Sequence, residues 1–186
     1  YMSELLTRDY LGKHILGSLF SAALGDAMGA ATEQHQIDEI IEMHGGLLDK
    51  LVVPKNDTFS FRGDDVVGYV TDDTSQMFAL IEALISTDGE ITVKRWVEHL
   101  LEWAAYSPMR DQMGPTTKPM LEAIANGEST DHIGIVGTST RKLTSMGVTN
   151  GAAMRVAPAG LINPGNIEEA VKTAWVTCQP THDTQI

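Results

Sequence analysis

The apolar residues recur at helical intervals along most of the chain. Spacings of three and four predict helices from about residue 9 to 32 and from Thr74 to Ser86, the second with Met77, Leu80, Ile81, Leu84 and Ile85 facing inward. Capping residues, among them Thr92 and Asn166, and glycine stops delimit the further helices that we expect over residues 36–44, 93–104, 115–125, 152–161 and 167–176. Thr181 and His182 resemble the start of one more helix. The pattern therefore predicts an all-α fold.

Residues 47–70 interrupt this pattern. The stretches 51–54 and 59–63 are expected to form either a small hairpin or an ordered irregular loop. No repeat or linker divides the sequence, so a single domain over residues 1–186 is predicted. Because a helix that begins at Thr181 has too few residues to bury a face, we expect this domain to be incomplete at its C-terminus.

The charge of the chain restricts its partners. With 13 basic and 25 acidic residues, the net charge is −12, which disfavours nucleic acid and anionic lipid surfaces. An anionic ligand needs a helix N-terminus, a basic group or a metal to make the electrostatic potential locally positive. A lone cysteine, Cys178, fits a reducing compartment, and neither a targeting signal nor a membrane-spanning run is evident. These features predict a cytoplasmic protein.

Acidic residues gather at two places in the sequence. Thr71, Asp72 and Asp73 precede a helix, where adjacent oxygens suit a hard divalent cation; ordinary helix capping is the alternative. Asp26 and Glu33 are seven residues apart and are expected on one face at the end of their helix. Asp26 could equally cap a neighbouring segment, and Glu33 could be an exposed helix-end acid.

Two glycine-containing turns and two basic residues complete the candidate chemistry. Gly114–Thr117 and Gly147–Gly151 present backbone amides at the starts of predicted helices, as anion sites do, although such turns are most often only turns. His182 is either a functional histidine or a solvated capping one. For Arg155, in an apolar helix, we favour a structural role in neutralising a buried acid.

In order along the chain, these segments resemble the ADP-ribosylglycohydrolase family, which includes the enzyme that reactivates ADP-ribosylated dinitrogenase reductase. The resemblance spans nearly the whole chain, and its specific parts are the Thr71-Asp72-Asp73 triplet and the run from Asn150 to Pro158. The other matching stretches are Gly17-Ser18-Leu19, Gly25-Asp26-Ala27-Met28-Gly29 with Glu33, Gly114-Pro115-Thr116-Thr117 and Thr181-His182.

The resemblance implies a compact orthogonal helical bundle that hydrolyses an ADP-ribosyl glycosidic bond with two Mg²⁺ ions, or with Mn²⁺ in their place. Thr71, Asp72 and Asp73 would be metal ligands, and Glu33, Asp72 and Asp73 would act in catalysis. The ADP-ribose or ADP-ribosylated substrate would be bound by Asp26, Gly114, Thr116, Gly147, Asn150, Gly151 and His182.

The family's second aspartate-rich motif, of the form Asp-x-Asp-Thr/Ser, is absent from this sequence. Asp64-Asp65 precedes the triplet, and Asp183-Thr184 contains a single acid. The chain could therefore be a fragment of an active hydrolase, an ADP-ribose-binding module without turnover, one copy in an oligomer that completes the site, or a purely structural relative. We favour a fragment with impaired activity and expect such fragments to associate.

Overall fold

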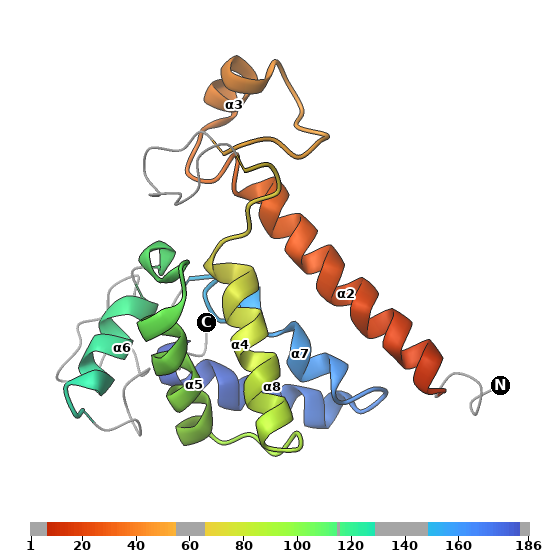
Figure 1. Ribbon diagram of the computed structural model, residues 1–186, viewed down its shortest axis with the longest axis vertical. Coiled ribbons are helices and arrows are strands. Elements are labelled where there is room, and N and C mark those ends of the chain that lie inside the picture. Colours follow the sequence, from red (N-terminus) through yellow and green to blue (C-terminus); the bar gives the residue numbers. More distant parts are fainter. Residues whose placement is uncertain (1–6, 55–65, 115, 129–148, 183–186) are drawn as a thin grey trace. The chain divides into compact units, whose positions relative to one another are not determined.

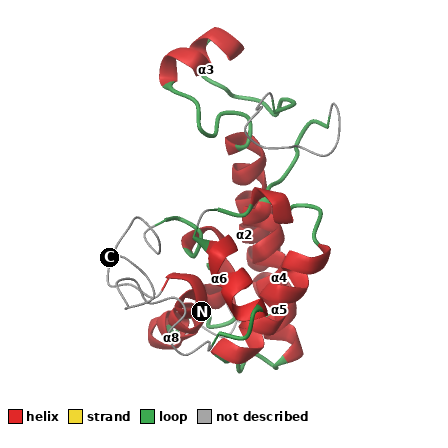
Figure 2. Ribbon diagram, turned by 90° about the vertical axis from the view of Figure 1, so that its left-hand side faces the viewer, coloured by secondary structure: helices red, strands yellow, loops and turns green. Residues whose placement is uncertain are grey.

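The computed structural model describes residues 7–54, 66–114, 116–128 and 149–182. Every regular element in these ranges is helical, which confirms the all-α prediction (Figures 1 and 2). The internal contacts divide the chain into two units, residues 1–74 and 75–186, which are described separately. The prediction of a single domain stays a prediction.

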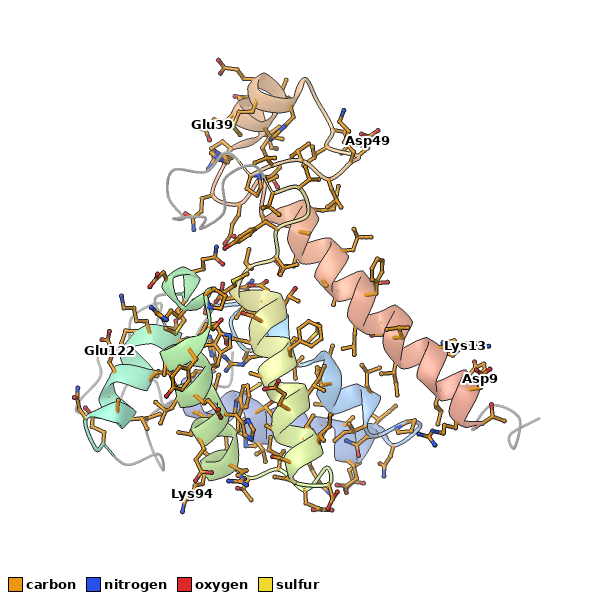
Figure 3. All side chains as sticks on the ribbon, in the orientation of Figure 1. Asp9, Lys13, Glu39, Asp49, Lys94 and Glu122 are labelled. Atoms are coloured by element: carbon orange, nitrogen blue, oxygen red, sulfur yellow. The ribbon has the colours of Figure 1, made fainter. Side chains whose placement is uncertain are left out.

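The first unit contains helices α2 (Arg8–Gly29) and α3 (Ile37–His44). The hydroxyl oxygen of Thr7 caps α2 by accepting a hydrogen bond from the Tyr10 amide at 3.2 Å. Figure 3 shows Asp9 and Lys13 beside one another at the start of α2, where their exposed side chains form an ion pair. Helix α3 ends at Gly45, whose positive φ of 78° is the left-handed conformation that glycine adopts without strain.

The segment after α3 lacks regular structure wherever it is described. Residues 47–54 and 66–71 contain neither helix nor strand, and residues 55–65 lie outside the described ranges. One arm of the predicted hairpin, residues 59–63, therefore cannot be compared, whereas the other, residues 51–54, is irregular. This segment leads into helix α4, Asp72–Ser86, whose first turn contains the boundary between the units.

The core of the second unit lies between α4, α5 (Val93–Tyr106) and α6 (Thr117–Ala125). Its centre is made of buried aliphatic and tryptophan side chains from these helices: Ala79, Leu80, Ala83, Leu84, Trp96, Leu100, Trp103 and Leu121. The expected inward position of Ile85 is wrong, because its side chain is 72% exposed. A short 3₁₀ turn, η1 (Arg110–Gln112), connects α5 to the segment that enters α6.

The last part of the second unit departs from the sequence prediction twice. The helix expected over 152–161 is split into a 3₁₀ turn, η2 (Ala153–Arg155), and a short helix, α7 (Ala157–Leu161). Helix α8 (Ile167–His182) continues through Pro180, so the separate helix expected at Thr181 does not form. Packing of α8 against α5, α6 and α7 (Figure 1), with its last turn buried, outweighs the cost of an internal proline. No helix of the described segments has the length and apolar character required to cross a membrane.

Candidate functional site

The N-terminus of α4 is capped by a carboxylate from α2. Asp26 Oδ2 accepts hydrogen bonds from the Thr71 amide at 2.9 Å, the Thr74 amide at 3.2 Å and the Thr74 hydroxyl, while Oδ1 accepts one from the Thr71 hydroxyl at 2.8 Å. Amides in the first turn of a helix need such an external acceptor. Asp26 thus has the capping role that the sequence left open, and its role in substrate binding stays a prediction.

Thr71 completes this cap. Its hydroxyl donates to Asp26 and accepts a bond from the Asp73 amide at 3.3 Å. A hydroxyl oxygen has two lone pairs, so one remains after this contact. Capping by Thr71 and Asp26 means that the side chains of Asp72 and Asp73 are not required to begin the helix. The capping and metal-binding interpretations of the triplet are therefore compatible.

Four carboxylates of the first unit share one electrostatic environment. Burial raises the pKa of Asp72, which is 7% exposed, to about 8, with further contributions from the charges of Asp73, Glu33 and Asp26. The pKa of Asp73 is raised by burial and then by Asp26. Acids that repel one another in this way are stabilised by a bound cation or by shared protons.

Glu33 reaches this cluster from a turn. Helix α2 ends at Gly29, and the Glu33 amide donates to the Gly29 carbonyl at 2.9 Å. The expectation that Asp26 and Glu33 lie on one helical face is therefore wrong, because the helix ends between them. The side chain of Glu33 is exposed, yet partial desolvation and the charges of Asp73 and Asp26 raise its pKa.

The donor chemistry of this cluster fits a hard divalent cation. Carboxylate and hydroxyl oxygens are the ligands that Mg²⁺ and Mn²⁺ prefer. Among the described residues, no three His, Cys, Asp or Glu side chains are arranged as a metal site. The assignment of Thr71, Asp72 and Asp73 as metal ligands accordingly stays a prediction, supported by the donor type and by the mutual repulsion of the acids.

The second unit places His182 against a glycine turn. A Cβ atom on Gly151 would lie 2.9 Å from His182 Cε1 and 3.4 Å from the Thr117 hydroxyl oxygen, so only glycine lets the imidazole approach here. His182 Nε2 is 2.8 Å from the Thr149 hydroxyl oxygen. His182 and Gly151, which are predicted binding residues distant in sequence, are therefore adjacent in the structure, beside the start of α6.

A buried arginine lies behind this histidine. Arg155 is 1% exposed and donates to Gln76 Oε1 and to the Thr181 hydroxyl, each at 2.6 Å. Its guanidinium carbon lies 5.4 Å from the centre of the Trp96 ring, within range of a cation–π interaction. These contacts support the structural role expected for Arg155, although both of these hydrogen-bond acceptors are neutral rather than acidic.

Comparison with known proteins agrees with this architecture. The model of a protein family described as ADP-ribosylglycohydrolase matches residues 7–186. The chain belongs to the ADP-ribosylglycohydrolase family. It is 31% identical over 180 residues to a protein of Escherichia coli (strain K12) described as uncharacterized protein YegU. It is also 28% identical over 164 residues to an uncharacterized protein of Archaeoglobus fulgidus.

The alignments to these members of the ADP-ribosylglycohydrolase family are unequal in coverage. They include 94% and 88% of this chain, but 49% and 48% of the two relatives. The chain thus spans about half the length of the curated relatives that it matches. The family is hydrolytic, and its helical fold agrees with the one described above.

The remaining predicted site residues belong to the two glycine-containing motifs noted in the sequence. Gly114 and Thr116 precede α6; the Gly114 carbonyl accepts a bond from the Lys118 amide, and Thr116 is buried. Asn150 is exposed, and its carbonyl accepts a bond from the Met154 amide. Gly147 lies outside the described residues. Binding roles for these four residues stay predictions.

Sequence reasoning missed the hydroxyl groups that surround His182. Thr149 precedes the noted Asn150-Gly151 pair, and Thr181 precedes the histidine, so their positions within motifs were an available signal. Gln76 had no such signal, because its contact with Arg155 joins residues that are 79 positions apart.

Proposed function

We propose that this chain contributes to the magnesium-dependent hydrolysis of an ADP-ribosyl glycosidic bond, releasing ADP-ribose from a protein or a small molecule. The observation that carries the proposal is the group of four carboxylates at the start of α4, in which Asp72 has a pKa raised to about 8. Membership of a hydrolytic family supports the reaction class.

The residues at the start of α4 would hold the cation. Thr71, Asp72 and Asp73 supply hydroxyl and carboxylate oxygens, and Asp26 fixes the turn that presents them. A bound Mg²⁺ would supply positive charge for the acidic cluster and for an incoming diphosphate, and would polarise water or the ribose hydroxyls. This positive charge would offset the repulsion between an anionic substrate and a chain with a net charge of −12.

The carboxylates have a second use in this chemistry. Departure of a leaving group from the anomeric carbon of ribose builds oxocarbenium-like positive charge, which nearby carboxylates stabilise. A raised pKa brings Glu33 closer to the range in which a carboxyl can accept and return a proton. Glu33 would therefore orient the attacking water or act as its general base, with Asp72 and Asp73 beside the metal.

The residues around His182 would bind the ADP-ribose. A turn is formed by Thr149, Asn150 and Gly151, of which the first two are exposed, and His182 lies against that turn. Backbone amides and neutral donors at such a turn suit phosphate oxygens. Gly114 and Thr116, before α6, would extend this surface, and a binding role for Gly147 stays a prediction.

Release of ADP-ribose tests the proposal. The chain and the Escherichia coli relative would each be incubated with ADP-ribosyl-arginine, ADP-ribosyl-serine and O-acetyl-ADP-ribose, with Mg²⁺ and with EDTA. We expect magnesium-dependent release that is lost in Asp73→Asn and retained in Asp49→Asn, an exposed acid of the same unit. Binding of ADP-ribose by the chain without release would favour a binding module. If the chain neither bound ADP-ribose nor released it from a substrate, the proposal would be contradicted.

A further inference from the structure

A continuous line of hydrogen bonds joins a buried arginine to an exposed threonine in the second unit. Arg155 Nη2 lies 2.6 Å from the Thr181 hydroxyl oxygen, and that oxygen lies 2.7 Å from His182 Nδ1. On the other side of the ring, His182 Nε2 lies 2.8 Å from the Thr149 hydroxyl oxygen. Arg155, Thr181 and His182 are buried, whereas Thr149 is exposed.

The direction of each hydrogen bond follows from its donors and acceptors. A guanidinium group can only donate, so Thr181 accepts from Arg155 and its own hydrogen must be directed elsewhere. Among the described residues, the other hydrogen-bond partner of this hydroxyl is His182 Nδ1. Thr181 therefore donates to Nδ1, since the opposite direction would leave a fully buried hydroxyl hydrogen without an acceptor.

The histidine must then carry its hydrogen on Nε2. Burial and the nearby positive charge of Arg155 lower the pKa of His182 to about 4, so the ring is neutral near pH 7 and has one N–H group. With Nδ1 as an acceptor, that group is Nε2–H, which donates to Thr149. The Gly151 amide also donates to the Thr149 hydroxyl oxygen, over a longer distance of 3.5 Å.

We propose that Arg155 is a positioning residue, which acts through Thr181 to fix His182 in the Nε2–H tautomer and so leaves the hydroxyl of the exposed residue Thr149 as a hydrogen-bond donor toward a phosphate oxygen of the ligand. The ligand part of this inference rests on the function proposed above. The tautomer part rests only on the contacts within the second unit. Arg155 acts through the Thr181 hydroxyl, which it obliges to donate to His182 Nδ1.

This line of hydrogen bonds favours ligand groups that accept a hydrogen bond from the Thr149 hydroxyl. A hydroxyl whose oxygen already accepts from an imidazole has a more acidic hydrogen, because hydrogen bonds in series polarise one another. The positive charge at the buried end strengthens this effect in the direction of Thr149. Phosphate oxygens are therefore favoured over donor groups at this position, in a chain whose overall charge is strongly negative.

The tautomer can be measured directly. Nitrogen-15 NMR of the unliganded chain at pH 7, with His182→Asn to assign the signals, distinguishes a protonated ring nitrogen from an unprotonated one. We expect an unprotonated Nδ1 and a protonated Nε2 in His182. A protonated Nδ1 with an unprotonated Nε2, or a doubly protonated ring, would overturn the inference. This measurement needs no variant of Thr181 or Arg155.

Variants of one threonine test the role of Arg155 and Thr181. Thr181→Val keeps the shape and removes the hydroxyl, so a mixture of tautomers is expected, whereas Thr181→Ser should restore the Nε2–H form. Thr177→Val is the matched control, because Thr177 is an equally buried threonine on α8 whose hydroxyl donates to the Ala174 carbonyl and is not part of the line from Arg155 to His182. Unchanged tautomer populations in Thr181→Val would overturn the inference.

Calorimetric titration with ADP-ribose separates this inference from the proposed function. Loss of one directed hydrogen bond is expected to weaken ADP-ribose binding about tenfold in Thr181→Val and in Thr149→Val, with recovery in Thr181→Ser. The predicted tautomer without ADP-ribose binding in the unmodified chain would reject the proposed function and leave the positioning role intact. Binding that is unaffected by Thr181→Val would reject the positioning role and leave the function intact.

Discussion

Asp72→Asn is expected to stabilise the metal-free chain, although it removes a proposed metal ligand. The carboxyl of Asp72 is buried, and its ordinary pKa of 3.8 is raised to about 8. The folded state therefore binds a proton more tightly than the unfolded state. This difference means that Asp72 lowers stability progressively as the pH rises from about 4 to about 8.

The size of the effect follows from the same values. At pH 7 the solution is roughly three pH units above the ordinary pKa of 3.8, and at 1.36 kcal/mol per unit the upper limit is about 4 kcal/mol. An asparagine also forgoes the favourable interactions of the carboxylate with the first turn of α4. We therefore expect Asp72→Asn to raise the free energy of unfolding by about 1–3 kcal/mol at pH 7, and by much less at pH 4.5.

Urea unfolding in EDTA, followed by far-ultraviolet circular dichroism, measures this difference. The control is Asp49→Asn, which makes the same change in charge on the segment that follows α3, where Asp49 is exposed and labelled in Figure 3. Asp49→Asn should leave stability within about 0.5 kcal/mol of the unmodified chain. A destabilised Asp72→Asn variant at pH 7, or a gain that does not depend on pH, would refute the electrostatic reasoning.

Three further substitutions probe other parts of the structure. Asp26→Asn should lower stability by about 2 kcal/mol in urea unfolding, because an amide cannot accept all the hydrogen bonds at the start of α4; a gain like that expected for Asp72 would contradict the capping role. Gly151→Ala should weaken ADP-ribose binding about tenfold by displacing the ring of His182, whereas Gly160→Ala, with open space at its Cβ, should not; equal affinities in calorimetry would argue against a site at this turn. Because the pKa of His182 is lowered to about 4, acidification from about pH 6.5 to 4 protonates this histidine in the unfolded state first and reduces stability. His182→Asn should flatten this pH dependence of stability in urea titrations. An unchanged pH dependence would show that His182 is not buried as a neutral group.

Local features of the fold could be predicted from the sequence. Thr92 and Asn166 cap their helices as expected, because their side-chain oxygens accept hydrogen bonds from the amides of Arg95 and Glu169, three residues ahead. Such caps depend on neighbours along the chain and so leave a pattern in the sequence. The same patterns placed the starts of α5 and α8 correctly.

Contacts between distant residues could not be predicted in this way. The bond from Thr71 to Asp26 joins residues 45 positions apart, and the bond from His182 to Thr149 joins residues 33 apart. The family resemblance placed Asp26 and His182 among the candidates, but the partners that hold them follow from tertiary packing. Packing also decided the course of α8, whose buried last turn outweighs the helix-breaking tendency of Pro180.

The central claim, that the start of α4 is a divalent-cation site, is tested most directly by calorimetric titration of the metal-free chain with Mg²⁺ and with Mn²⁺. Binding is predicted for the unmodified chain and for Asp49→Asn, with loss of at least tenfold in affinity for Asp72→Asn and for Asp73→Asn. The same affinity in all four proteins would contradict the claim, as would the absence of any binding in the unmodified chain.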